Sequence, residues 1–180
     1  MHEIIAEAGS NHNGSITRAC DLVDLAARAG ATSVKFQFIF ADGLYLPAYY
    51  DAGDYVDNSV YLSRKAEELG REDWAHIWRH AEAVGIDISA SVFDSQGLVL
   101  LSELGANYVK IASTDATNHE LIGQACDLFG RVIVSTGMAS MAEIDSLVGF
   151  VRGNFPSTDL HLMHCVSIYP CPIDSANIQR

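Results

Sequence analysis

The sequence predicts an α/β fold with parallel strands. Three observations support this prediction. Short apolar segments rich in β-branched residues alternate with amphipathic stretches, and this unit recurs about every 20 to 28 residues. Glycines separate the helical stretches from the strands that follow them. Such alternation is typical of strand–helix units that build a parallel sheet.

The predicted strands are short apolar segments of the kind that is buried on both faces of a parallel sheet. They cover residues 3–9, 32–38, 86–92, 107–113, 131–137 and 159–167.

The predicted helices are stretches in which apolar residues recur every three or four positions. Trp74 and Trp78 are one helical turn apart, which favours a role in packing rather than in ligand binding. The four stretches are residues 16–26, 74–81, 121–129 and 141–151.

The helix ends also carry sequence signals. Thr117 with Glu120, and Ser140 with Glu143, have the spacing of a capping box. Four glycines follow helical stretches, where a left-handed backbone would end the helix; they are Gly30, Gly85, Gly105 and Gly130.

The segment between residues 38 and 72 is longer than the other connections. It is polar, aromatic and glycine-containing, and it follows the carboxyl end of a strand. In α/β folds such a segment usually covers the binding site, and we expect the same here.

Six strands leave two architectures open. One is an open doubly wound sheet, and the other is a (β/α)8 TIM barrel truncated to about six βα strands. Neither GxGxxG nor GxxxxGK[ST] follows a predicted strand, which disfavours a nucleotide-binding sheet.

Composition and charge exclude several classes of protein. The 180 residues are 49% hydrophobic and 19% charged, as expected for a globular domain. With 11 basic and 23 acidic residues the net charge is -12, so we expect no binding to nucleic acid or to anionic membranes. The chain has neither a secretory signal nor an apolar run long enough to span a membrane, and its four cysteines form no CxxC pair. We therefore expect a cytoplasmic protein with reduced thiols.

Polar residues gather where the predicted strands end. Two lysines with serines nearby could bind a small polyanion such as a phosphorylated carboxylic acid. Alternatively, Lys35 pairs with Glu7 and Lys110 with Asp115 as internal salt bridges. The candidate positions are Glu7, Lys35, Gln37, Ser89, Ser91, Lys110, Ser113, Asp115, Ser135, Ser167 and Tyr169.

Two histidines receive structural interpretations. His12, in the turn-forming segment SNHNG, is predicted to be a turn residue rather than a catalytic one. His164 has no second ligand placed for it, so we expect no metal site within this chain.

Five segments resemble the N-terminal barrel of the sialic acid synthases, which include N-acetylneuraminate synthase. In chain order they are IAEAGSNHNGS, VKFQ, YVKIAS, VIVSTGMAS and MHCVSIYPCP. The resemblance spans nearly the whole chain. It implies a transferase of sialic acid biosynthesis, which condenses phosphoenolpyruvate with an N-acetylated amino sugar, releases phosphate and yields a nine-carbon α-keto acid.

The resemblance also implies roles for single residues. Glu7, Gln37 and Asp115 match positions that face the sugar or the reacting centre, and either carboxylate could act as the acid or base. Of the matched positions, Glu7, Lys35, Lys110 and Asp115 are the candidate catalytic residues. The positions that match those around phosphoenolpyruvate are Lys35, Ser91, Lys110, Ser113, Ser167 and Tyr169.

The chain departs from the family pattern in three ways. Ser91-Val92 replaces the usual Thr-Pro, and Asp115 replaces a glutamate. The family's divalent metal, typically Mn2+, is held by two histidines on strands seven and eight, which we expect beyond residue 180. The small C-terminal domain that resembles antifreeze proteins, and that completes the site in family homodimers, is expected to be absent as well. We therefore expect residues 1–180 alone to be inactive.

The sequence leaves open which sugar is the acceptor and which class of reaction the protein catalyses. N-acetylmannosamine is the default acceptor in the family, but legionaminic, pseudaminic and spore-coat sugar synthases share the same motifs. A Schiff-base aldolase that uses Lys110 is a hypothesis from another class. A non-catalytic barrel fragment that binds or assembles with another chain is a third hypothesis.

Overall fold

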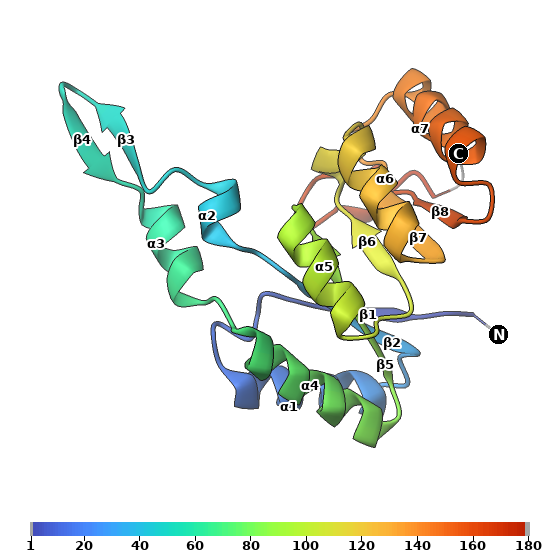
Figure 1. Ribbon diagram of the computed structural model, residues 1–180, viewed down its shortest axis with the longest axis horizontal. Coiled ribbons are helices and arrows are strands. Elements are labelled where there is room, and N and C mark those ends of the chain that lie inside the picture. Colours follow the sequence, from blue (N-terminus) through green and yellow to red (C-terminus); the bar gives the residue numbers. More distant parts are fainter. Residues whose placement is uncertain (1, 179–180) are drawn as a thin grey trace. The chain divides into compact units, whose positions relative to one another are not determined.

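The computed structural model describes residues 2–178 of the chain. The chain divides into two compact units, Met1–Ala106 and Asn107–Arg180. Each unit contains three parallel strands in sequential order together with the helices that connect them (Figure 1).

The first unit is built on strands β1 (Ile5–Gly9), β2 (Ser33–Gln37) and β5 (Asp87–Val92). Strand β2 lies between the other two, and both pairings are parallel. The register places Glu7 beside Lys35 and Lys35 beside Ser89. Because alternate residues of a strand point to opposite faces, these three share one face of the strands.

Helices α1 (Ile16–Arg28), α4 (Arg71–Val84) and α5 (Ser95–Glu103) connect or follow these strands. Helix α1 begins where the Ser15 hydroxyl accepts a hydrogen bond from the N–H of Arg18, and α4 ends at Gly85 in the left-handed conformation. Figure 1 shows α1 and α4 side by side, and His80 of α4 is within 2.7 Å of Asp24 of α1.

An aromatic core lies between α4 and the strands of the first unit. Trp74 contacts Phe36, Phe38 and His12, with ring centroids 5.5, 4.7 and 5.4 Å apart. Trp78 continues the cluster at 5.8 Å from Phe38, and all five residues are buried. The packing role predicted for the two tryptophans is therefore confirmed.

The second unit repeats the pattern with strands β6 (Val109–Ile111), β7 (Arg131–Ser135) and β8 (Asp159–Met163), again parallel and with β7 in the middle. Helices α6 (His119–Leu128) and α7 (Met141–Asn154) connect them. Short 3-10 turns η1 (Ser113–Asp115) and η2 (Ile173–Ser175) follow β6 and β8.

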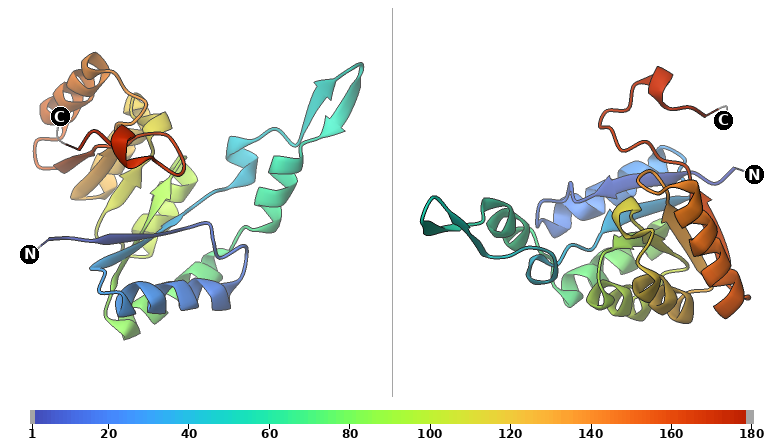
Figure 2. Two further views of the ribbon diagram at one scale, coloured as in Figure 1. Left: turned by 180° about the vertical axis from the view of Figure 1, so that it is seen from behind. Right: turned by 90° about the horizontal axis from the view of Figure 1, so that it is seen from above.

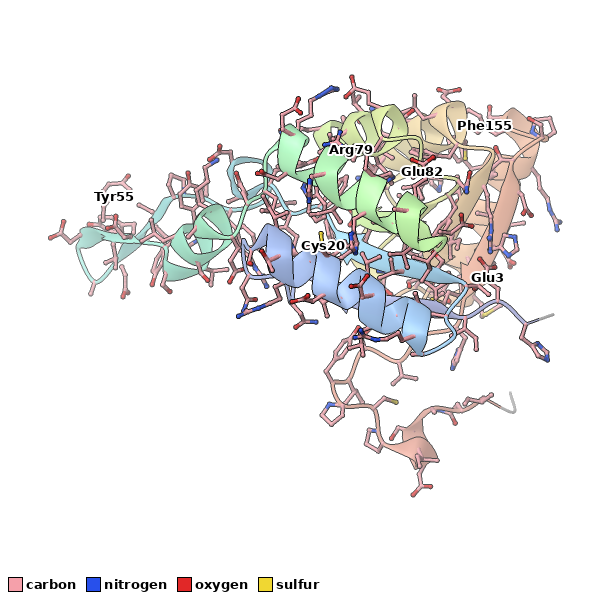
Figure 3. The ribbon with its side chains drawn as sticks, turned by 90° about the horizontal axis from the view of Figure 1, so that it is seen from below. Glu3, Cys20, Tyr55, Arg79, Glu82 and Phe155 are labelled. Carbon is pink, nitrogen blue, oxygen red and sulfur yellow. The ribbon has the colours of Figure 1, made fainter. Side chains whose placement is uncertain are left out.

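The segment after β2 contains regular structure that its composition did not reveal. It forms α2 (Ala41–Leu44), a hairpin of β3 (Ala48–Asp51) and β4 (Asp54–Asp57), and α3 (Ser59–Ala66). The hairpin projects away from the strands of its unit (Figure 2), and Tyr55 lies near its far end (Figure 3). Tyr50 and Tyr55 pack edge to face across the two strands, with ring centroids 5.5 Å apart.

The structure confirms the α/β fold class and all six predicted strands, with somewhat shorter ends. The four predicted helices and the Ser140–Glu143 capping box are also confirmed. Helix α5 was not predicted, because its apolar residues Leu98, Val99, Leu100 and Leu101 are contiguous and show no helical spacing.

Two predicted helix signals are wrong. Gly30, Gly85 and Gly105 adopt positive φ angles, but Gly130 does not, because α6 ends in extended backbone at Phe129. The N-cap of α6 is Asn118 rather than Thr117, since the Asn118 side chain accepts the N–H of Leu121 at 3.1 Å.

Membrane insertion through a helix finds no support in residues 2–178, since none of the helices there combines the length and apolarity that a membrane crossing needs.

The burial of His12 in the aromatic core can be tested through its effect on the pH dependence of stability. Its Nδ1 accepts the N–H of Gly14 at 3.1 Å, as predicted for a turn residue, and its ring is buried against Trp74. Burial lowers the pKa of His12 below its usual 6.5, and nearby Glu67 partly opposes that shift. The unfolded chain therefore takes up a proton at a higher pH than the folded chain does.

We predict that the free energy of unfolding falls as the pH drops from 7 to 5, because only the unfolded state gains this proton readily. His12→Gln should be less stable at pH 7 but should lose less of its remaining stability on acidification. Urea titrations at several pH values, with the exposed His76→Gln as control, provide the measurement. An unchanged pH dependence in His12→Gln would contradict the assignment.

Candidate functional site

The first unit gathers four predicted site residues, which we call the Lys35 cluster: Glu7, Lys35, Gln37 and Ser91. The Lys35 ammonium is 2.5 Å from a carboxylate oxygen of Glu7 and donates to the Ser91 hydroxyl at 2.7 Å. Lys35 is 5% exposed, whereas the side chain of Glu7 is 56% exposed. A buried cation is thus compensated by a carboxylate that solvent and small molecules can reach.

The strand register explains this arrangement. Lys35 lies beside Glu7 in β1, and Gln37 lies beside Ser91 in β5. Since the strands are parallel, residues near their carboxyl ends lie at one edge. The predicted internal pair between Lys35 and Glu7 is therefore confirmed, and it leaves the exposed carboxylate available for chemistry.

Gly9 lies close to the side chains of both Glu7 and Gln37. It has a φ of +58°, and a Cβ atom there would lie 3.5 Å from a Glu7 oxygen and 4.0 Å from the Gln37 amide oxygen. The pairing of β1 with β2 shifts register between Glu7 and Gly9. Glycine therefore lets the chain turn away while the two polar side chains stay close to it.

The second unit gathers another set, the Lys110 cluster: Lys110, Ser113, Ser135, Cys165 and Ser167. The Lys110 ammonium donates to the Ser135 hydroxyl and to the carbonyl of Ile111, the latter at 2.9 Å. The Ser135 oxygen is 3.1 Å from the Cys165 sulfur. Lys110 and Ser135 are both buried, at 6% and 5% exposure.

Gly137 brings the ends of β6, β7 and β8 together. Its N–H donates to the Ser113 hydroxyl at 3.3 Å. A Cβ atom at this position would lie 2.7 Å from the carbonyl oxygen of Cys165 and 3.0 Å from the Ser167 hydroxyl. Only glycine fits here, and its close approach brings Ser113 and Ser167 next to the turn after β7.

The remaining predicted residues lie on less buried segments. Asp115 ends the turn η1 and accepts a hydrogen bond from the Thr114 hydroxyl at 2.9 Å. Ser167 is exposed, and Tyr169 is 96% exposed on the irregular segment after β8.

A small cavity with a mixed polar and apolar lining adjoins Gln37 in the first unit. Its polar lining includes Ser10, His12, Arg64 and Glu67. Arg64 of α3 donates to the Ser10 hydroxyl at 3.1 Å and pairs with Glu67 at the same distance. The end of the segment between β2 and α4 is thereby anchored beside Gln37, while its hairpin projects outward.

The described residues do not fit a metal ion. No group of three or more His, Cys, Asp or Glu side chains within residues 2–178 could hold one. The Nε2 atom of His164 is 2.8 Å from the carbonyl oxygen of Ala176, and His161 pairs with Asp159. We therefore assign no metal-dependent step to these residues.

Sequence reasoning missed Gly137 and Cys165 as members of the site. Gly137 is the last residue of the predicted strand 131–137, so its place at a strand end was a usable signal. The contact of Cys165 with Ser135 depends on how β8 pairs with β7, which the sequence does not encode in any readable pattern.

The fold and the two clusters define a class of protein. Parallel strands end in buried lysines with hydroxyl partners, and such cations suit small anionic substrates. The chain belongs to the NeuB family, whose model matches residues 22–180.

Relatives and a solved structure agree with this assignment. The chain is 35% identical to N,N'-diacetyllegionaminic acid synthase of Legionella pneumophila, over 98% of the chain and 52% of the relative. It is 30% identical to N-acetylneuraminate-9-phosphate synthase of Drosophila melanogaster, over 98% of the chain and 48% of the relative. The chain thus spans about half the length of the curated relatives it matches.

The N-acetylneuraminic acid (sialic acid) synthetase of Leptospira borgpetersenii, solved in complex with citrate, superposes with a TM-score of 0.82. It is 32% identical, and the match covers 97% of this chain and 57% of that one. This likeness confirms the barrel-type fold class, with six of its strands in the present chain, over an open doubly wound sheet.

The packing around Gly137 yields a prediction with a matched control. Gly137→Ala should destabilise the protein by about 1–3 kcal/mol, because the methyl group would overlap the Cys165 carbonyl. Gly130 directly precedes β7 and does not have a positive φ, and a methyl group added there would meet no neighbour within 4 Å. Gly130→Ala should therefore change stability by less than about 1 kcal/mol, and in the stabilising direction. Equal urea midpoints for the two variants would refute this account.

Proposed function

We propose that the protein condenses phosphoenolpyruvate with the open-chain aldehyde of an N-acetylated amino sugar. The products are inorganic phosphate and a nine-carbon α-keto acid. The observation that carries the proposal is the pair of buried, hydroxyl-bonded lysines, Lys35 and Lys110, in a chain of the NeuB family.

Phosphoenolpyruvate carries a phosphate and a carboxylate, and each needs fixed cations and hydroxyl donors. In the proposed function Lys35 with Ser91, and Lys110 with Ser113 and Ser167, provide these groups. Tyr169 is the further candidate contact.

The enol carbon of phosphoenolpyruvate forms the new bond to the aldehyde carbon, whose oxygen then takes a proton. Water adds to the resulting oxocarbenium-like carbon, and phosphate leaves. Glu7 is the stronger candidate for these proton transfers, because its exposed carboxylate is held 2.5 Å from Lys35. Asp115 is the alternative, and Gln37 is proposed to bind the sugar.

N-acetylmannosamine is the proposed acceptor. Phosphorylated N-acetylmannosamine and the legionaminic acid precursor are the next acceptors to test, because the relatives include synthases named for the products N-acetylneuraminate 9-phosphate and N,N'-diacetyllegionaminic acid. Pseudaminic and spore-coat sugar precursors complete the panel to be tested. We further propose a cytoplasmic location and a homodimer.

The first test compares lysine variants. Lys35→Ala and Lys110→Ala should each lower kcat/KM for phosphoenolpyruvate about tenfold to hundredfold, because a charged hydrogen bond contributes roughly 1.5 to 3 kcal/mol. Lys65→Ala removes an exposed lysine paired with Asp42 and is the control. The full-length protein is used, and its release of phosphate is measured with each acceptor sugar. Normal turnover in either site variant would remove that lysine from the site.

A trapping experiment on the same full-length protein tests the alternative that the enzyme is a Schiff-base aldolase. Borohydride with pyruvate would trap a Schiff base on Lys110 if the enzyme used imine chemistry. We expect no such adduct by mass spectrometry, and a stoichiometric adduct would replace the condensation proposal.

A requirement for a divalent metal, Mn2+ in the first place, is a separate proposal. Dialysis against EDTA should abolish phosphate release, and Mn2+ should restore it. Full activity after exhaustive chelation would contradict this proposal.

A further inference from the structure

Lys110 is held by a chain of hydrogen bonds that crosses three neighbouring strands. The lysine lies in β6, Ser135 lies in β7, and Cys165 lies two residues after β8. The ammonium contacts the Ser135 hydroxyl, and the hydroxyl oxygen is 3.1 Å from the Cys165 sulfur.

The chemistry of the three groups restricts which of them donates each hydrogen bond. An ammonium has only donors, so the Ser135 oxygen must accept from Lys110. The Ser135 hydroxyl keeps its own hydrogen, and the Cys165 sulfur, 3.1 Å from the hydroxyl oxygen, can accept that hydrogen or can itself donate to the oxygen. When the hydroxyl donates to the sulfur, the two hydrogen bonds polarise one another, which strengthens the contact to the lysine.

The position of Cys165 is fixed independently of its thiol. Its carbonyl oxygen and Cβ pack against Gly137, where an added methyl group would approach them to 2.7 and 3.0 Å. The backbone of Cys165 therefore cannot move toward β7. The sulfur is presented to Ser135 from a rigid support.

We propose that Cys165 is a positioning residue that orients Ser135 and, through it, the ammonium of Lys110 toward the anionic substrate. This inference rests on the proposed function, because it assigns Lys110 to phosphoenolpyruvate. The thiol itself touches no substrate in this proposal.

Three variants of the full-length protein test the role. Cys165→Ala removes the sulfur acceptor and should raise KM for phosphoenolpyruvate roughly twofold to tenfold, as expected for one neutral hydrogen bond. KM for the amino sugar should not change. Cys165→Ser retains an acceptor and should restore most of the loss. Cys126→Ala, on helix α6, is the matched control for a half-buried thiol and should behave as the wild type.

The outcomes separate positioning from packing. If Cys165→Ala matches Cys126→Ala, the inference is wrong. If Cys165→Ser is as impaired as Cys165→Ala, or if both Michaelis constants rise together, the sulfur acts through packing and the inference is again wrong. Thermal unfolding of each variant confirms that the folded protein is compared.

A second measurement does not depend on turnover. The dissociation constant for inorganic phosphate, measured by calorimetry, should follow the same order across the three variants. If the wild type releases no phosphate from phosphoenolpyruvate but the order holds, the proposed function fails and the role of Cys165 stands. If the wild type binds no phosphate, or binds it as tightly as Cys165→Ala does, the positioning role is overturned.

Discussion

The burial of two lysine ammonium groups among apolar strands is the constraint on which the rest of the structure depends. A buried ammonium without partners costs several kcal/mol, so each lysine must have compensating groups where its strand ends. Lys35 meets this need with Glu7 and Ser91, while Lys110 has Ser135 and a backbone carbonyl among its partners. The partners of the first lysine include a carboxylate, and those of the second include a hydroxyl and a carbonyl group.

That difference has a chemical consequence. Glu7 neutralises Lys35 but remains more than half exposed, so the pair combines a cation with an accessible acid or base. The Ser135 hydroxyl and the Ile111 carbonyl are among the groups that hold the Lys110 ammonium. A buried ammonium held at the end of a strand is suited to an anionic group of a substrate.

The segment between β2 and α4 obeys a different constraint. Helix α3 buries none of its residues, and the β3–β4 hairpin exposes Tyr49, Tyr50 and Tyr55. Polar contacts organise its base instead: Lys65 bonds both Asp42 and Glu68, and these carboxylates raise the pKa of Lys65. The prediction that this segment covers a binding site receives support only near Gln37, where Arg64 contacts Ser10.

The sequence by itself determined the six strands, four of the helices and the packing of Trp74 and Trp78, and it offered the pair of Lys35 with Glu7 as one of two alternatives. These features follow from local periodicity and from the high cost of burying an unpaired lysine, both of which can be recognised without coordinates. It did not reveal α5, whose contiguous apolar residues lack helical spacing, or the β3–β4 hairpin, whose strands bury little apolar surface. Only the tertiary structure decided the roles of Gly137 and Cys165. Both act through contacts between residues at or just after the end of β7 and residues after β8, and strand register depends on packing between segments distant in the chain.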